Sequence, residues 1–121
     1  MKTRVVVCGG TDFNDRTLCF ETLGELLSGK SEIEIVSGHA RGADALGEEY
    51  AHEHSIELTL FPADWSRYGR AAGPIRNSQM IEYAQEANAL VVAFWNGKSP
   101  GTKNTIDLAK RLGIEIHIIR Y

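Results

Sequence analysis

Five short runs of β-branched or other apolar residues alternate along the chain with four segments of helical period, and this alternation most constrains the fold. The apolar runs predict β-strands at residues 4–8, 33–36, 58–61, 90–94 and 114–119. The segments between them predict helices around residues 18–27, 43–51, 80–87 and 106–112. A β-α-β-α-β-α-β-α-β order predicts an α/β fold with a mainly parallel five-stranded sheet between two layers of helices.

Boundary signals agree with this division, and the length agrees with one domain. Asn14 or Asp15 can cap the first helix, Gly73-Pro74 suits the start of the third, and Thr102 suits the start of the fourth. With 121 residues, 43% of them hydrophobic, the chain is predicted to form a single domain over residues 1–121.

Glycine pairs follow each of the first four predicted strands. In a parallel sheet these connections all emerge at the carboxyl edge, where open α/β folds bind ligands and glycine allows close backbone approach. Helix amino termini point to the same edge and favour anions. Tight turns also use glycine for their own geometry, but four successive pairs favour a site for a phosphate-bearing ligand. The pairs are Gly9 and Gly10, Gly38 and Gly42, Gly69 and Gly73, and Gly97 and Gly101.

The segment 64–81 is cationic in a chain whose net charge is −3. If Pro74 is the first helical residue, Arg76 lies in the first turn of the third helix, where a cation opposes the helix dipole. Two interpretations stay open: Arg76 contacts an anionic ligand, or it pairs with a carboxylate. The charged residues of the segment are Arg67, Arg70, Arg76 and Asp64, and the candidate partner carboxylates are Asp12, Asp44 and Asp64.

Two aromatic residues, Trp65 and Tyr68, lie in the same segment. Their rings can stack on a base. The large surface of a tryptophan nevertheless favours Trp65 as an anchor of this loop in the hydrophobic core.

Several familiar sites are missing from the sequence. The string Gly97-Lys98-Ser99 lacks the upstream glycine of a Walker motif, since position 92 is Val92, and no G-x-G-x-x-G follows the first strand. NAD-dependent redox chemistry therefore loses its support, and we expect no cofactor.

Four scattered histidines and two cysteines predict no metal site. We interpret Cys8 and Cys19 as small buried residues.

Charge and hydropathy limit the partners. A net charge of −3, from 13 basic and 16 acidic residues, argues against nucleic acid as a partner. The longest apolar run, residues 89–95, is far shorter than the roughly 20 residues of a membrane helix, so no membrane partner is expected. No secretory leader pattern precedes the first predicted strand, which predicts a cytoplasmic location. A homo-oligomer is compatible with such a domain, although the sequence holds no direct signal for one.

Six short segments carry a resemblance to a known family. They are GG at 9–10, SG at 37–38, RGAD at 41–44, FPADW at 61–65, YGRAAGPIRN at 68–77 and GT at 101–102. Through these motifs the chain resembles the SLOG superfamily, in particular its YspA-like, cpYpsA-related branch, over almost its whole length. The resemblance implies a Rossmann-like fold that binds nucleotides or nucleotide-derived ligands. It also implies kinship with the LOG phosphoribohydrolases and the DprA/Smf DNA-processing proteins.

Two segments match the LOG enzymes position by position. Residues 101–105 (GTKNT) match the phosphate-binding G-T-x-x-E segment except at the end, and residues 76–80 (RNSQM) match the R-K-x-x-M segment. Thr105 stands where the LOG enzymes carry the glutamate that acts at the ribose, and a hydroxyl substitutes poorly for a carboxylate in that role. The resemblance therefore implies phosphate handling without the LOG acid, unless Asp12, Asp44 or Asp64 supplies a carboxylate.

Two function classes follow from these observations. The leading hypothesis is a module that binds a nucleotide or nucleotide-derived ligand, such as an ADP-ribose-like molecule, as a sensor, sequestering protein or regulator. The alternative is a nucleotide N-glycosidase of the phosphoribohydrolase type that uses another carboxylate. The expected partner is a nucleotide-derived small molecule, and no catalytic residue is assigned. The predicted ligand-binding residues are Gly9, Gly10, Thr11, Ser37, Gly38, Arg41, Gly42, Asp44, Arg70, Arg76, Asn77, Gly97, Gly101 and Thr102.

Overall fold

Strands and helices alternate along the chain, with one short helical insertion before α4. The computed structural model describes residues 2–121, and Met1, part of the domain expected over 1–121, lies outside them. The strands are β1 (Thr3–Gly9), β2 (Ile33–Ser37), β3 (Glu57–Leu60), β4 (Asn88–Trp95) and β5 (Glu115–Arg120). The helices are α1 (Arg16–Leu27), α2 (Ala43–Glu53), α3 (Trp65–Tyr68), the 3₁₀ helix η1 (Gly69–Ala71), α4 (Ala72–Gln85) and α5 (Pro100–Arg111). No helix among the described residues is long and apolar enough to span a membrane.

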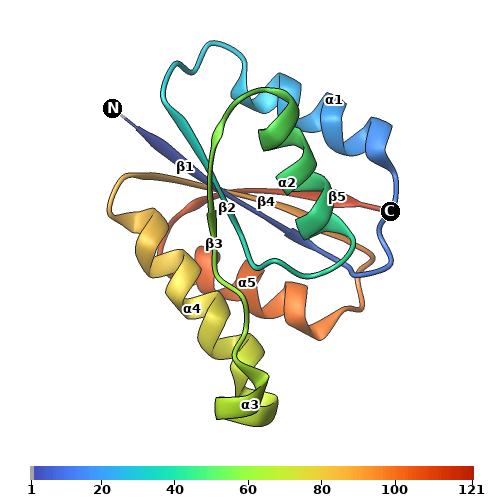
Figure 1. Cartoon of the computed structure of the whole chain (residues 1–121), viewed down its shortest axis with the longest axis vertical. Helices are drawn as coiled ribbons and strands as arrows, with labels where there is room; N and C mark the ends of the chain where they lie inside the picture. Colours follow the sequence, from blue (N-terminus) through green and yellow to red (C-terminus); the bar gives the residue numbers. More distant parts are fainter. Residues whose placement is uncertain (1) are drawn as a thin grey trace.

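The five strands form one sheet in the order β3-β2-β1-β4-β5, and every neighbouring pair is parallel. Helices α1 and α2 cover one face, and α4 and α5 cover the other (Figure 1). The predicted α/β class and parallel five-stranded sheet are confirmed. Strand order reverses at β1, so the connections after β1 and β4 leave on opposite faces. Such a reversal opens a crevice at the carboxyl edge.

The core consists of two apolar layers, one on each face of the sheet. Val5 and Val7 of β1 pack under α1 and α2, whereas Val6 and Cys8 pack under α4 and α5. This division follows from the two-residue period of strand side chains. Cys8 and Cys19 are buried free thiols, as expected.

The segment before α4 departs from expectation. Residues expected to form a loop form α3 and η1, which run directly into α4. Helix α4 therefore begins at Ala72, and Arg76 is its fifth residue, so the first-turn position expected for Arg76 is wrong. Pro74 is the third residue of α4 and not the first. Proline is tolerated there, because the N–H groups of the first turn have no acceptor within the helix and none is lost.

The other helix starts are close to expectation. The Asp15 side chain caps α1 by accepting a hydrogen bond from the Leu18 N–H at 3.0 Å. Helix α5 begins at Pro100, two residues before the predicted Thr102, with Ser99 at the N-cap. Proline is well suited to the first helical position.

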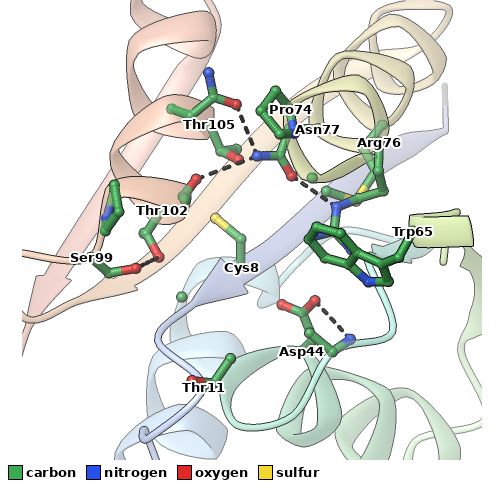
Figure 2. Close-up of a pocket in the computed structure, with 17 residues that line it drawn as sticks. Cys8, Thr11, Asp44, Trp65, Pro74, Arg76, Asn77, Ser99, Thr102 and Thr105 are labelled. Atoms are coloured by element: carbon green, nitrogen blue, oxygen red, sulfur yellow. Dashed lines mark hydrogen bonds between the residues drawn. The ribbon is translucent and has the colours of Figure 1, made fainter. Parts of the chain in front are cut away.

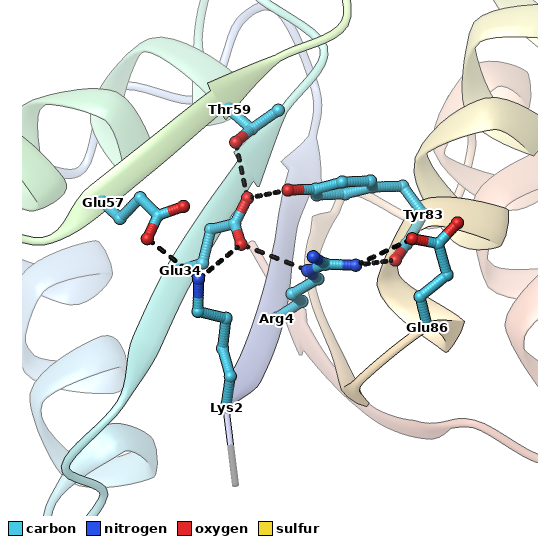
Figure 3. A network of polar contacts seen from close by, with 7 residues as sticks. All are labelled: Lys2, Arg4, Glu34, Glu57, Thr59, Tyr83 and Glu86. Carbon is cyan, nitrogen blue, oxygen red and sulfur yellow. Dashed lines mark hydrogen bonds and ion pairs between the residues drawn. The ribbon is translucent and has the colours of Figure 1, made fainter.

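A charged cluster joins β1, β2, β3 and α4 at the amino end of the sheet (Figure 3). The Glu34 side chain on β2 is 0% exposed and accepts hydrogen bonds from the hydroxyls of Thr59 and Tyr83 and from Arg4 Nε at 3.1 Å. The Arg4 guanidinium also lies 3.8 Å from the centre of the Tyr83 ring. Burial raises the pKa of Glu34, but the hydrogen bonds from Thr59, Tyr83 and Arg4 outweigh it and hold the pKa below its ordinary value.

Candidate functional site

A pocket of about 400 Å³ lies at the carboxyl edge of the sheet, between the connections that follow β1 and β4 (Figure 2). The strand order reverses at this point, which is where open α/β sheets bind ligands. Its volume falls within the range of small-molecule sites, about 300 to 1,000 Å³. The first turns of α2, α4 and α5 all contribute to its lining.

The first turn of α5 forms one wall of the pocket, with Ser99, Gly101 and Thr102 in its lining. The backbone N–H groups of Gly101 and Thr102 have no acceptor within the helix. The Ser99 side chain does not cap them, and it accepts a hydrogen bond from the Thr102 hydroxyl at 3.3 Å. Free N–H groups and the positive end of the helix dipole make this wall suited to an anion.

Arg76 contributes positive charge from α4. Its Nη1 donates to the Gly38 carbonyl at 2.6 Å, and its Nε donates to Asn77 Oδ1 at 2.9 Å. A guanidinium carries five N–H donors, so these two hydrogen bonds leave donors for a ligand. Asn77 in turn donates to Asn104 Oδ1 at 2.9 Å and joins α4 to α5. Arg76 is the one cation among the described residues that line the pocket.

Asp44 in the first turn of α2 is the one carboxylate among the described lining residues. Its side chain is buried, and Oδ2 accepts a hydrogen bond from the Ala40 N–H at 3.1 Å. Burial raises the pKa of Asp44 to about 6, although the Ala40 hydrogen bond and the charge of Arg76 act in the opposite direction. Asp44 and Arg76 form no ion pair; both lie against Gly38, where a Cβ would be 2.5 Å from Arg76 Nη1 and 2.9 Å from Asp44 Oδ2.

The predicted ligand-binding residues fall into three groups. Residues that line the pocket are Gly9, Thr11, Asp44, Arg76, Asn77, Gly101 and Thr102. Residues close to the pocket but outside its lining are Ser37, at the end of β2, and Gly10, Gly38 and Gly42 of the adjoining connections. The remaining residues outside the lining are the exposed Arg41 and Arg70, and Gly97, which lies against the Arg120 guanidinium.

Glycines of the second group hold backbone segments together. A Cβ at Gly42, whose φ is +76°, would lie 2.2 Å from the Gly10 carbonyl oxygen. The Ala43 N–H donates to the same oxygen at 3.2 Å. Only glycine allows this approach between the connections after β1 and β2. The glycines at these positions therefore allow the connections around the site to pack closely, and they do not line the pocket themselves.

Sequence reasoning missed part of the lining, including Ser99 and Asn104. The Ser-Pro pair at 99–100 is a helix-start signal that predicts Ser99 at the N-cap. No comparable signal marks Asn104. Trp65 also lines the pocket, and its side chain is 59% exposed. The interpretation of Trp65 as a core anchor is wrong, because α3 projects from the body of the domain (Figure 1).

The candidate reactive groups differ in their access to the pocket. Asp12 accepts a hydrogen bond from the Tyr121 hydroxyl at 2.6 Å, and Asp64 caps α3 through the Arg67 N–H at 3.1 Å; neither lines the pocket. Cys8 does line it, but burial raises the pKa of its thiol further above neutral pH, so the reactive thiolate does not form there. Thr105, which the sequence resemblance aligns with the LOG glutamate, lines the pocket as a buried residue.

Asp44→Asn is expected to stabilise the protein above pH 6. A folded-state pKa of about 6 exceeds the unfolded value of about 3.9, so the wild type loses stability as pH rises between these values. A shift of this size corresponds to at most about 3 kcal/mol. We expect a gain of about 1 to 2 kcal/mol, because the asparagine amide needs its own hydrogen-bond partner. Urea unfolding at pH 8 and pH 4 checks this, and a gain as large at pH 4 would show that the cost of ionising a buried carboxyl is not its cause.

Three comparisons with known proteins show what the chain is similar to. A family model described as YAcAr, the YspA, cpYpsA-related SLOG family, matches residues 3–68. The Gene 61 protein of Mycobacterium phage D29 is 31% identical over 119 residues, which cover 93% of each protein. The X-ray structure of DNA processing protein A (DprA) from Streptococcus pneumoniae has a similar fold, with a TM-score of 0.53 and 15% identity. The alignment covers 97% of this chain but only 58% of the DprA chain.

Proposed function

The chain belongs to the YspA, cpYpsA-related SLOG family, and on that premise we propose that its pocket binds a nucleotide or nucleotide-derived small molecule. One observation carries this proposal: an open helix amino terminus, an arginine with free donors and a buried carboxylate line the same pocket. Phosphate and ribose together require these chemistries, with donors for the phosphate oxygens and an acceptor for the ribose hydroxyls.

Each part of such a ligand has a matching wall. The phosphate lies against the N–H groups of Gly101 and Thr102, within the field of Arg76. The ribose hydroxyls donate to the carboxylate of Asp44. Binding of this kind suits a sensor, a sequestering protein or a regulator of an ADP-ribose-like ligand in the cytoplasm.

A second candidate function is cleavage of the N-glycosidic bond. Asp44 favours it, because a buried carboxyl with a pKa of about 6 can transfer protons near neutral pH. Thr105 argues against it, because a buried hydroxyl occupies the position of the LOG glutamate. We therefore favour binding without turnover.

Incubation of the protein with nucleoside monophosphates and ADP-ribose separates the two functions. The wild type is expected to bind at least one of these molecules in calorimetry and to release no free base or ribose phosphate above background in chromatography. The physical reason is that Thr105 replaces the LOG glutamate, whose general acid/base help would be worth about 10²- to 10⁴-fold. Base release by the wild type that Asp44→Asn abolishes would establish the enzyme instead.

A further inference from the structure

Trp65 presents a large aromatic surface at the mouth of the pocket. Its side chain is 59% exposed and lines the pocket from α3. The position that a Cβ on Gly73 would occupy lies 3.4 Å from Trp65 Cη2, so one edge of the indole rests against the start of α4. Among the described residues, no other ring or cation stacks on this indole.

Trp95 and Tyr68, in contrast to Trp65, each have a cation near the ring. The Trp95 indole donates from Nε1 to the Ser99 carbonyl at 3.1 Å, and the Arg120 guanidinium lies 5.4 Å from its ring centre. Tyr68, also on α3, has the Arg67 guanidinium 5.1 Å from its ring centre and does not line the pocket. Trp65 therefore combines a position in the pocket lining with a largely exposed indole on which no ring or cation of the described residues stacks.

Trp65 and the anion-binding wall lie on opposite sides of the pocket. Figure 2 shows Ser99 and Thr102 on one side, Trp65 and Arg76 on the other, and Cys8 and Asp44 between them. Asn77 links Arg76 to the α5 wall, because it accepts a hydrogen bond from Arg76 Nε at 2.9 Å and donates one to the Gly101 carbonyl at 3.3 Å. A nucleoside monophosphate has the same order of parts, since its phosphate and base extend from opposite ends of the ribose. A phosphate at the start of α5 and a ribose at Asp44 direct the base toward Trp65.

We propose that Trp65 is the residue that binds the base of the ligand, by stacking its indole on the base. This inference rests on the proposed function and adds the ligand class: a nucleotide with an intact base, and not a sugar phosphate. Stacking accepts any base, because every base has a π-face, so Trp65 selects for the presence of a base and leaves its identity to other contacts.

The test compares the four ribonucleoside 5′-monophosphates with ribose 5-phosphate, which lacks the base. In calorimetry, the wild type is expected to bind at least one nucleotide more tightly than ribose 5-phosphate. Trp65→Leu is expected to weaken nucleotide binding about tenfold and to leave ribose 5-phosphate binding unchanged. Tyr68→Leu removes an aromatic ring from the same helix outside the pocket and serves as the matched control, with neither affinity changed. Nucleotide binding is also expected to quench tryptophan fluorescence in the wild type, and Trp65→Leu is expected to abolish most of the quenching.

The outcomes separate this inference from the proposed function. Equal losses of nucleotide and ribose 5-phosphate binding in Trp65→Leu would overturn it, because Trp65 would then only shape the pocket. Unchanged nucleotide affinity in Trp65→Leu would overturn it as well, while leaving nucleotide binding itself in place. A wild type that binds neither the nucleotides nor ribose 5-phosphate would overturn both. Urea unfolding checks that Trp65→Leu folds as the wild type does.

Discussion

Glu34→Ala is expected to destabilise the fold by about 3 to 5 kcal/mol, because it removes the fully buried carboxylate at the centre of a charged cluster. The Arg4 guanidinium would lose its buried partner, and the hydroxyls of Thr59 and Tyr83 would lose their acceptor. Urea unfolding measures the loss. The matched control is Glu57→Gln, because Glu57 contacts Lys2 in the same cluster but its side chain is 54% exposed. That change is expected to cost less than about 1 kcal/mol.

The pH dependence of a milder variant, Glu34→Gln, identifies the origin of this effect. Since the pKa of Glu34 is held below its ordinary value, its contribution to stability is present above about pH 4 and is lost as the pH falls through the folded-state pKa. The stability difference between wild type and Glu34→Gln should therefore narrow in acid. A difference that stays constant from pH 7 to pH 3 would show that side-chain shape, and not ionisation, explains the loss.

Arg76→Ala is expected to weaken binding of a phosphorylated ligand by at least about 1.5 kcal/mol, the lower end for a hydrogen bond to a charged group. Arg76 is the one cation among the described lining residues, and its two observed hydrogen bonds leave donors for the phosphate. Calorimetry with a nucleoside monophosphate and with the matching nucleoside measures the effect, which should be smaller for the nucleoside.

Arg70→Ala is the matched control for this prediction. Arg70 belongs to the same cationic segment, but it is exposed on η1 and does not line the pocket. Its replacement should leave both affinities unchanged. Equal losses for the nucleotide and the nucleoside in Arg76→Ala would show that Arg76 supports the connection at Gly38 and does not contact phosphate.

The sequence was sufficient to predict the layered fold and the family. Strand periodicity and the glycine-rich connections after the strands are local properties, and they identify a parallel sheet and its carboxyl edge without knowledge of long-range contacts. The resemblance to the SLOG superfamily is confirmed by the family match. The helical form of residues 65–71 was not predictable in this way, because that segment is short, projects from the domain and has no buried residue in α3.

There is also a physical reason why only some of the predicted ligand-binding residues line the pocket. Glycine placement indicates where backbones come close, but it does not tell whether a ligand or another loop occupies the space. Gly101 lies at the pocket wall, whereas Gly42 makes room for the Gly10 carbonyl. Trp65 illustrates the opposite problem, since its expected burial depended on where α3 lies, which is a long-range property of the chain.

Titration of the isotope-labelled protein with nucleoside monophosphates and ADP-ribose, followed by backbone amide NMR, tests the central claim most directly. A chain of 121 residues suits this measurement. The predicted result is a saturable set of shifts centred on the amides of Gly101 and Thr102, with further shifts near Ala40 and Trp65. No shifts at millimolar ligand, or shifts centred on the opposite end of the sheet around Glu34, would contradict nucleotide binding at this pocket.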